Sequence, residues 1–276
     1  MSNRAVVLVF SHKPRLEWYE EISFRQCLRV LNRHPLRLVC PEGLDVSAYR
    51  AMAPALAVDF IPPEWMSSYR AYNRLKILPF LYRRYARFEY ILTYELDAFV
   101  FRDELSEWCS KGWDYVGAPW FEGWQHAARD ARPIGVGNSG FSLRRTRAVL
   151  QISGSWRYQQ PATDVLRAWR RGEYDTKRLI GALTYRNNFF APFNDRANYY
   201  NEDVFWGRVV AERFPSFRVA PYEVARQFSF EVNPGRLFRE CGHSLPFGCH
   251  KWMEFEPEFW YEHIRPLGYV IPARVK

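Results

Sequence analysis

The amino-acid sequence predicts an α/β fold whose mainly parallel central sheet is flanked by helices. Over the first hundred residues, short apolar segments typical of strands alternate with amphipathic segments typical of helices. This alternation indicates βαβ units, which build parallel sheets. The apolar run at residues 91–101 predicts a buried strand at the centre of that sheet.

The first half, to about residue 103, has the pattern of a nucleotide-binding half-domain. Its expected strands are Ala5–Phe10, Leu36–Cys40, Val58–Ile61 and Ile91–Phe101. Its expected helices are Trp18–Asn32 and Tyr69–Arg87, and in the second of these the arginines lie opposite the apolar face. The acidic residues of the last strand form the far wall of this half.

The second half, from about residue 104 to residue 276, changes character. We expect strands at Trp113–Val116 and after the glycines of Gly135–Arg145, helices at Val165–Leu183 and within Tyr200–Phe214, and a loop at Asn187–Tyr200. No internal repeat or low-complexity linker divides the sequence. Residues 1–276 are therefore expected to form a single domain with a nucleotide side and an acceptor side.

The composition describes a globular, basic protein. Hydrophobic residues make up 48% and aromatic residues 18% of 276, and the net charge of +9 comes mainly from arginine. Guanidinium groups suit phosphate, so a pyrophosphate or polyanion is one expected partner, and a solvated basic surface is the alternative.

The cysteines and the N-terminus predict a cytoplasmic location. The five cysteines are odd in number and lack CxxC pairing, so we expect reduced thiols. The first apolar stretch is too short for a signal peptide or a membrane span. Peripheral association with the inner face of the membrane is a further expectation, since a basic surface is attracted to anionic lipids.

Two carboxylates, Glu95 and Asp97, interrupt the apolar run. Alternate residues of a strand share a face, so both are expected on one side of it. Unpaired buried charges are costly, and a divalent cation at the strand's C-terminal end would neutralise them. Ion pairs with the arginines of the chain are the alternative.

Read with its surroundings, Glu95-Leu96-Asp97 resembles the Asp-any-Asp motif of the GT-A nucleotide-sugar glycosyltransferases. The resemblance implies a Rossmann-like GT-A fold and Mn²⁺ or Mg²⁺ held against the donor diphosphate. Glutamate in the first position departs from the motif. Asp97 is therefore the firmer metal ligand, and Glu95 is expected at the metal or at the ribose or sugar hydroxyls. The chain also looks like a poorly characterised domain family assigned to this fold.

The segment Gly135–Arg145 resembles the Gly-Asn-Gly-Gly-Phe-Ser-Leu-Arg segment of several GT-A families. The resemblance places the acceptor at Gly137, Asn138, Ser139 and Gly140. Glycine admits close backbone approach, and the Asn138 amide suits sugar hydroxyls. A glycine hairpin before a core strand is the alternative.

The segment Tyr200–Trp206 resembles the Glu-Asp-Val-Tyr segment of inverting galactosyl- and N-acetylglucosaminyltransferase-like families. The resemblance makes Asp203 the catalytic base and Glu202 the residue that orients the acceptor. A carboxylate at a helix start is expected to stay ionised. A plain helix cap is the alternative.

The segment Pro246–Trp252 resembles the C-terminal His/Lys/Trp segment of glycogenin-like and lipopolysaccharide-galactosyltransferase-like enzymes. By this resemblance His250 is a metal ligand and Lys251 contacts the diphosphate. Imidazole with carboxylates suits Mn²⁺. A purely structural histidine is the alternative.

The remaining candidates are residues that could equally be plain structure or surface. Phe10, Ser11 and His12 are expected to cradle the base, Arg74 and Lys76 to reach the diphosphate, and Trp120 to stack on a sugar ring.

Together these resemblances imply a metal-dependent hexosyltransferase that moves a sugar from a UDP-linked donor to a glycan or lipid-linked acceptor. The Glu202–Asp203 segment points to inversion, whereas the histidine tail resembles retaining families. A metal-dependent nucleotidyltransferase or phosphohydrolase is an alternative. A nucleic-acid-binding protein is another, although no motif for it occurs and nucleic acid is not an expected partner.

Overall fold

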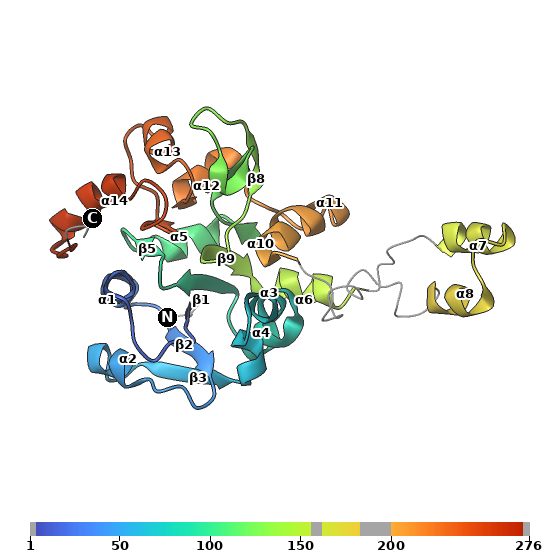
Figure 1. The fold of residues 1–276 in the computed structure, drawn as a ribbon, viewed down its shortest axis with the longest axis horizontal. Coiled ribbons are helices and arrows are strands. Elements are labelled where there is room, and N and C mark those ends of the chain that lie inside the picture. Colours follow the sequence, from blue (N-terminus) through green and yellow to red (C-terminus); the bar gives the residue numbers. More distant parts are fainter. Residues whose placement is uncertain (1–3, 156–161, 183–199, 273–276) are drawn as a thin grey trace.

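The computed structural model describes residues 4–155, 162–182 and 200–272, and a six-stranded sheet forms its centre (Figure 1). The strand order is β3-β2-β1-β4-β9-β6. The first four strands are mutually parallel, β9 is antiparallel to β4, and β6 is antiparallel to β9. The expected mixed, mainly parallel sheet is therefore confirmed.

The strands of this sheet coincide with the apolar runs of the sequence. They are β1 (Ala5–Phe10), β2 (Leu36–Pro41), β3 (Ala57–Ile61), β4 (Tyr90–Glu95), β6 (Tyr115–Val116) and β9 (Phe141–Arg145). In the pairing of β1 with β4, Phe10 lies opposite Glu95, so these two parallel strands end together. The residues that follow them therefore meet at one edge of the sheet, where ligands bind in open α/β folds.

Helices cover both faces of the sheet because alternate residues of β1 point to opposite sides. Val7 and Val9 pack with α1 (Trp18–Val30), whereas Val6 and Leu8 pack with α3 (Tyr69–Ile77) and α4 (Pro79–Arg84). The sheet is thus buried on both faces by the helices that the periodicity predicted.

The single helix expected at Tyr69–Arg87 is wrong, because the structure has two helices there. Leu78 has an extended backbone with ψ of 155° and separates α3 from α4. Pro79 causes the break, since proline disfavours helical conformation in the residue before it and is well suited to begin a helix.

The expected strand Ile91–Phe101 is also divided. β4 ends at Glu95, and the Ala98 amide donates to the Glu95 carbonyl at 2.9 Å, which closes a turn around Asp97. The argument that alternation along one strand brings the two carboxylates together is therefore wrong. The turn does so instead.

After the turn, β5 (Phe99–Val100) joins a second sheet of order β10-β11-β5. β10 (Ser229–Phe230) and β11 (Gly248–Cys249) are parallel, and Phe230 lies opposite Cys249. Glu231 and His250 each follow one of these paired residues. The small sheet therefore brings residues that are far apart in the sequence to the turn that holds Asp97.

The remaining elements surround these two sheets. They are α2 (Ser47–Met52), η1 (Pro63–Met66), α5 (Leu105–Ser110), the hairpin β7 (Pro119–Phe121) and β8 (Pro133–Val136), η2 (Trp124–His126), α6 (Thr146–Ser153), α7 (Ala162–Arg170), α8 (Thr176–Ala182), α10 (Glu202–Val204), the π-helix η4 (Phe205–Val210), α11 (Ala211–Arg213), α12 (Tyr222–Phe228), α13 (Pro234–Glu240), α14 (Pro257–Ile264) and η5 (Arg265–Leu267).

Three expectations for the second half have different outcomes: one is wrong, one is confirmed and one is not tested. The helix expected at Val165–Leu183 is two helices, α7 and α8, with a turn between them, and in Figure 1 the pair stands apart from the central sheet. The helix within Tyr200–Phe214 is present as α10, η4 and α11, with a π-helical middle. The expected loop Asn187–Tyr200 lies outside the described residues except at Tyr200.

All five cysteines are free, as expected for reduced thiols. Among the described helices, none has the length and apolar character needed to cross a bilayer.

Candidate metal and nucleotide site

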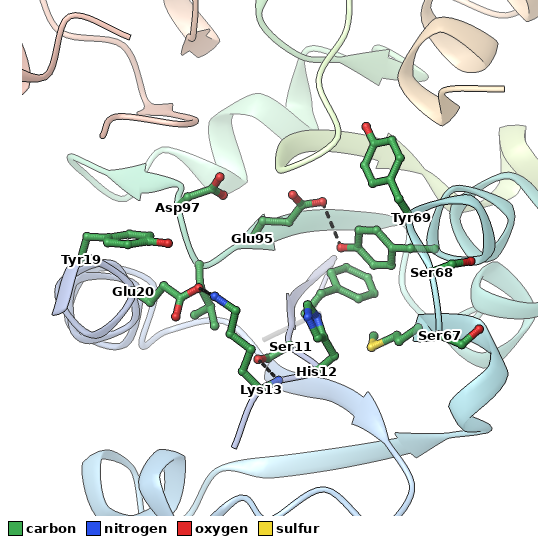
Figure 2. Close-up of a pocket in the computed structure, with 14 residues that line it drawn as sticks. Ser11, His12, Lys13, Tyr19, Glu20, Ser67, Ser68, Tyr69, Glu95 and Asp97 are labelled. Carbon is green, nitrogen blue, oxygen red and sulfur yellow. Dashed lines mark hydrogen bonds and ion pairs between the residues drawn. The ribbon is translucent and has the colours of Figure 1, made fainter. Parts of the chain in front are cut away.

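A pocket of about 520 Å³ opens at the edge of the central sheet where β1 and β4 end (Figure 2). Residues from the β1 end, α1, the η1–α3 segment and the β4 end line it: Phe10, Ser11, His12, Lys13, Tyr19, Glu20, Met66, Ser67, Ser68, Tyr69, Tyr72, Glu95, Leu96 and Asp97. The structure thus brings five of the predicted donor-site residues to one cavity: Phe10, Ser11, His12, Glu95 and Asp97.

The end of β1 forms the floor of this pocket. The Ser11 hydroxyl is 2.6 Å from the Tyr49 hydroxyl and accepts from the Lys13 amide at 3.2 Å, so it shapes the turn after the strand. Phe10 packs edge-on against Tyr72, whereas His12 is exposed. The turn after β1 is therefore held by hydrogen bonds within the protein, and His12 is the most accessible of the three predicted base-contacting residues.

Glu95 uses one of its two oxygens for hydrogen bonds within the protein. Its Oε1 accepts from the Lys76 ammonium, from the Tyr72 hydroxyl at 3.0 Å and from the Ser139 hydroxyl at 2.9 Å. Burial acts to raise the pKa of Glu95, but the Lys76 charge and His250 outweigh it and hold that pKa well below the usual range. Glu95 is thus ionised, and Oε2 is the atom left for a ligand.

His250 completes a group of three possible metal ligands with Glu95 and Asp97, whose ligand atoms all lie within 4.8 Å of one another. The imidazole Nε2 is 3.1 Å from Asp97 Oδ1 and 3.5 Å from Glu95 Oε2. Yet this buried nitrogen forms no hydrogen bond of acceptable geometry with any described residue. A nitrogen that faces two carboxylate oxygens without a hydrogen bond fits a divalent cation, and this donor set suits Mn²⁺.

The carboxylates around His250 also affect its pKa. Burial acts to lower the pKa of His250, but Asp97, Glu231 and Glu95 outweigh it and raise that pKa well above the usual value. The cluster therefore attracts positive charge, as a cation site must.

Gly140 lies directly against the His250 ring. A Cβ atom at this position would be 2.1 Å from His250 Nε2 and 2.2 Å from its Cδ2. Only glycine leaves room for the imidazole here, so the glycine turn helps to position the metal group.

The rest of the glycine turn forms contacts within the protein. Trp120 lies over Gly137, where a Cβ would be 2.1 Å from the indole, and the indole is largely buried. Asn138 Oδ1 accepts from the Phe141 amide at 2.7 Å, while its buried Nδ2 has no hydrogen-bond partner among the described residues. Of the four turn residues, Ser139 and Gly140 thus meet the metal group, and acceptor binding by the turn and by Trp120 stays a prediction.

The pair Glu202 and Asp203 lies in two distinct environments. Glu202 is fully buried and forms a two-pronged ion pair with the buried Arg144, with both contacts at 2.8 Å. Asp203 Oδ1 accepts from the Val204 amide at 2.8 Å. Burial and the neighbouring Glu202 charge raise the pKa of Asp203 to about 7. The expectation that the helix start keeps Asp203 ionised is therefore wrong, because burial and the Glu202 charge outweigh the effect of the helix start.

The predicted phosphate-contacting cations lie beside the pocket rather than in its wall. Lys76 is fully buried beneath Glu95, and its ammonium lies 4.2 Å from the Tyr72 ring centre. Arg74 lies over the Trp65 ring, and Lys251 pairs with Glu254 at 3.0 Å. Contact of these three cations with a diphosphate stays a prediction.

Among the described residues whose side chains form hydrogen bonds or ion pairs with those of Glu95, Asp97 or His250, sequence reasoning missed two, Tyr72 and Glu231. Tyr72 precedes Lys76 by four residues, a spacing that places both on one face of α3 and was available as a signal. Glu231 lies 2.9 Å from His250 Nδ1, on a contact that depends on the pairing of two-residue strands. No local pattern predicts such a contact.

A family model described as "Protein of unknown function (DUF5672)" matches residues 55–250. None of the curated proteins matches the sequence.

Several solved structures are similar to the chain at low sequence identity. Mouse xyloside xylosyltransferase 1 is 12% identical, with a TM-score of 0.49 over 88% of this chain and 96% of that one. An active-site mutant of LgtC is 15% identical, with a TM-score of 0.49 over 97% of this chain and 98% of that one. The core-mannan synthase A of Aspergillus fumigatus, in its Mn/GDP form, is 15% identical, with a TM-score of 0.32 over 43% of this chain and 42% of that one. The chain thus aligns with about two fifths of the length of that fungal enzyme.

Proposed function

The chain belongs to the DUF5672 family, whose function is unknown, and we propose that it is a metal-dependent glycosyltransferase with a nucleoside diphosphate sugar, most simply a UDP-sugar, as donor. The observation that carries the proposal is the buried His250 Nε2, which faces Glu95 and Asp97 at the wall of a 520 Å³ pocket. This pocket lies beyond the carboxyl ends of parallel strands and has room for a nucleotide.

Asp97, Glu95 Oε2 and His250 Nε2 would hold the cation. A bound Mn²⁺ or Mg²⁺ would serve as a Lewis acid that stabilises the negative charge of the leaving diphosphate. Lys76, Tyr72 and Ser139 orient Glu95 through Oε1, so their role is to keep Oε2 directed at the ligand. The hexose would lie next to Asp97, with the nucleoside over the end of β1.

Asp203 is the proposed general base. With a pKa of about 7, its carboxylate is a stronger proton acceptor than an ordinary aspartate, and about half of it is ionised at pH 7. The Arg144 ion pair ties Glu202 into the core, so Glu202 would support Asp203 through its charge. Attack by the activated hydroxyl opposite the leaving group would invert the anomeric centre, and NMR of the product's anomeric configuration tests this outcome.

Paired substitutions test the two roles. Asp97→Asn should lose both sugar transfer and metal-dependent UDP binding, whereas Asp203→Asn should lose transfer and keep UDP binding. Asp130→Asn, an exposed site outside the pocket, is the matched control. Equal UDP binding by both site variants would contradict the assignment. Release of pyrophosphate or inorganic phosphate instead of UDP would favour the nucleotidyltransferase or phosphohydrolase.

The proposed acceptor is a glycan or a lipid-linked saccharide, reached from the cytoplasmic face of a membrane. The net charge of +9 supports this proposal, as do the exposed Leu166 and Trp169 of α7 and Ile180 of α8, since basic segments with exposed apolar side chains bind anionic bilayers. The test is flotation with phosphatidylserine vesicles. The Trp169→Ser/Ile180→Ser double variant should float less than the unaltered chain, and equal flotation would contradict the proposal.

A further inference from the structure

We infer that Glu231 is a positioning residue that keeps the Nε2 lone pair of His250 available to the cation. The inference rests on the proposed function, because it concerns how the same metal group is held. Glu231 is not among the residues that line the pocket, and it lies outside the four sequence segments that carried the resemblance.

The contact between Glu231 and His250 is buried and specific. Glu231 Oε1 lies 2.9 Å from His250 Nδ1, and the two side chains are 13% and 5% exposed. Within the described residues, the Glu231 carboxylate forms no other hydrogen bond or ion pair. Its one polar contact there is therefore with Nδ1, the ring nitrogen opposite to the one that faces Glu95 and Asp97.

The chemistry of the two groups determines where the imidazole proton lies. A carboxylate only accepts hydrogen bonds, so Nδ1 must carry a proton to bond with Glu231. When the imidazole is neutral, as metal binding requires, it has one such proton, which leaves Nε2 unprotonated with its lone pair free for the cation. Nε2 is the atom that lies 3.1 Å from Asp97 Oδ1 and 3.5 Å from Glu95 Oε2. Glu231 thus selects the form of His250 that can bind a metal.

The backbone holds both partners in register. Glu231 and His250 each follow a two-residue strand, and these strands pair in parallel. The His250 amide also donates to the Phe230 carbonyl at 3.0 Å. Gly140 closes the other side of the ring, where a Cβ would be 2.1 Å from Nε2. The imidazole is therefore held between Glu231 and the glycine turn.

Mn²⁺ affinity of the full chain, measured by electron paramagnetic resonance without nucleotide, tests the inference. Glu231→Leu removes the acceptor and should weaken Mn²⁺ binding by about 10- to 100-fold, as second-shell substitutions do. Glu231→Gln keeps an oxygen that accepts from Nδ1–H and should bind within a few-fold of the unaltered chain. Glu254→Leu is the control, because Glu254 pairs with Lys251 beside His250 but does not contact the imidazole.

Two results would overturn the inference while the proposed function stands. One is unchanged Mn²⁺ binding by Glu231→Leu, and the other is equal weakening by Glu231→Leu and Glu231→Gln. Failure of the unaltered chain to bind Mn²⁺ would instead overturn the proposed function, and the inference with it.

A second measurement needs no substitution at position 231. A long-range ¹H–¹⁵N spectrum of the histidine-labelled chain with Mg²⁺ and UDP should show the His250 proton on Nδ1, with His250→Gln identifying the signal. A proton on Nε2 in that complex would overturn the inference.

Discussion

The substitution Gly140→Ala should disable the proposed metal site without altering any ligand. The new Cβ would be 2.1 Å from His250 Nε2, whereas ordinary Cβ contacts begin near 3.4 Å. The imidazole must therefore retreat by about 1.3 Å, the difference between these two distances. Metal–ligand distances tolerate only about 0.2 Å. The ring cannot escape easily, because it is buried and its Nδ1 is bound to Glu231.

We expect the Mn²⁺ affinity of Gly140→Ala to fall by about 10- to 100-fold, comparable to the loss of an orienting residue. Isothermal titration calorimetry with Mn²⁺ measures the change, and thermal melting in EDTA shows whether the variant is folded. Gly154→Ala is the matched control, since Gly154 has an ordinary φ of −87° at the end of α6 and its nearest neighbour would be 3.3 Å away. Affinity within twofold of the unaltered chain in a folded Gly140→Ala variant would refute the reasoning.

Three further substitutions test the surroundings of the site. Because burial raises the pKa of Asp203 to about 7, the folded chain keeps a proton that the unfolded chain loses near pH 4, so the stabilising contribution of Asp203 falls as the pH rises through 7. In urea titrations, the unfolding free energy of Asp203→Asn minus that of the unaltered chain should therefore be larger at pH 8 than at pH 5. An equal difference at both pH values would contradict this. Arg144→Met leaves the buried Glu202 carboxylate unpaired and should cost about 3–5 kcal/mol of unfolding free energy in the same titrations. Adding Glu202→Gln should restore much of this loss. A loss under about 1 kcal/mol for Arg144→Met would show that the ion pair contributes little to stability. Gly137→Ala places a Cβ 2.1 Å from the Trp120 indole and should lower the unfolding free energy by about 1–3 kcal/mol, while the Mn²⁺ affinity stays unchanged. A loss of Mn²⁺ affinity without a loss of stability would contradict a packing role for Gly137.

The central sheet was predictable because each of its parallel strands is a local apolar run. β1, β2, β3 and β4 lie where the runs predicted them, and the periodicity of α1 was equally clear. The break at Leu78 was readable in principle, since Pro79 restricts the residue before it. Its signal was outweighed by the continuous apolar face of the flanking segments.

The candidate site was predictable only in part, since its residues come from segments of different character. Glu95 and Asp97 are noticeable because charge is rare in an apolar run, but the same run predicts a continuous strand where the structure has a turn. The position of His250 depends on β10 and β11, whose two residues each are too few to show a pattern. Glu231 had no signal of its own, because its importance arises from a pairing across 19 residues of sequence.

The environment of Asp203 shows a different limit of sequence reasoning. Its position at a helix start predicted an ionised carboxylate through the helix dipole. The structure instead places it half-buried beside Glu202, and desolvation with like charge raises its pKa to about 7. Burial is a property of the tertiary fold, so the sequence could supply only the local effect, which is the smaller one here.

Calorimetric titration of UDP into the chain, with Mn²⁺ and then with EDTA, is the most direct test of the central claim. GDP and CDP under the same conditions serve as the comparison. The proposed site predicts UDP binding that requires Mn²⁺ and is lost in Asp97→Asn. Binding of no nucleotide under any of these conditions, or UDP binding of equal strength in EDTA, would contradict a metal-dependent nucleotide-sugar site at Glu95, Asp97 and His250.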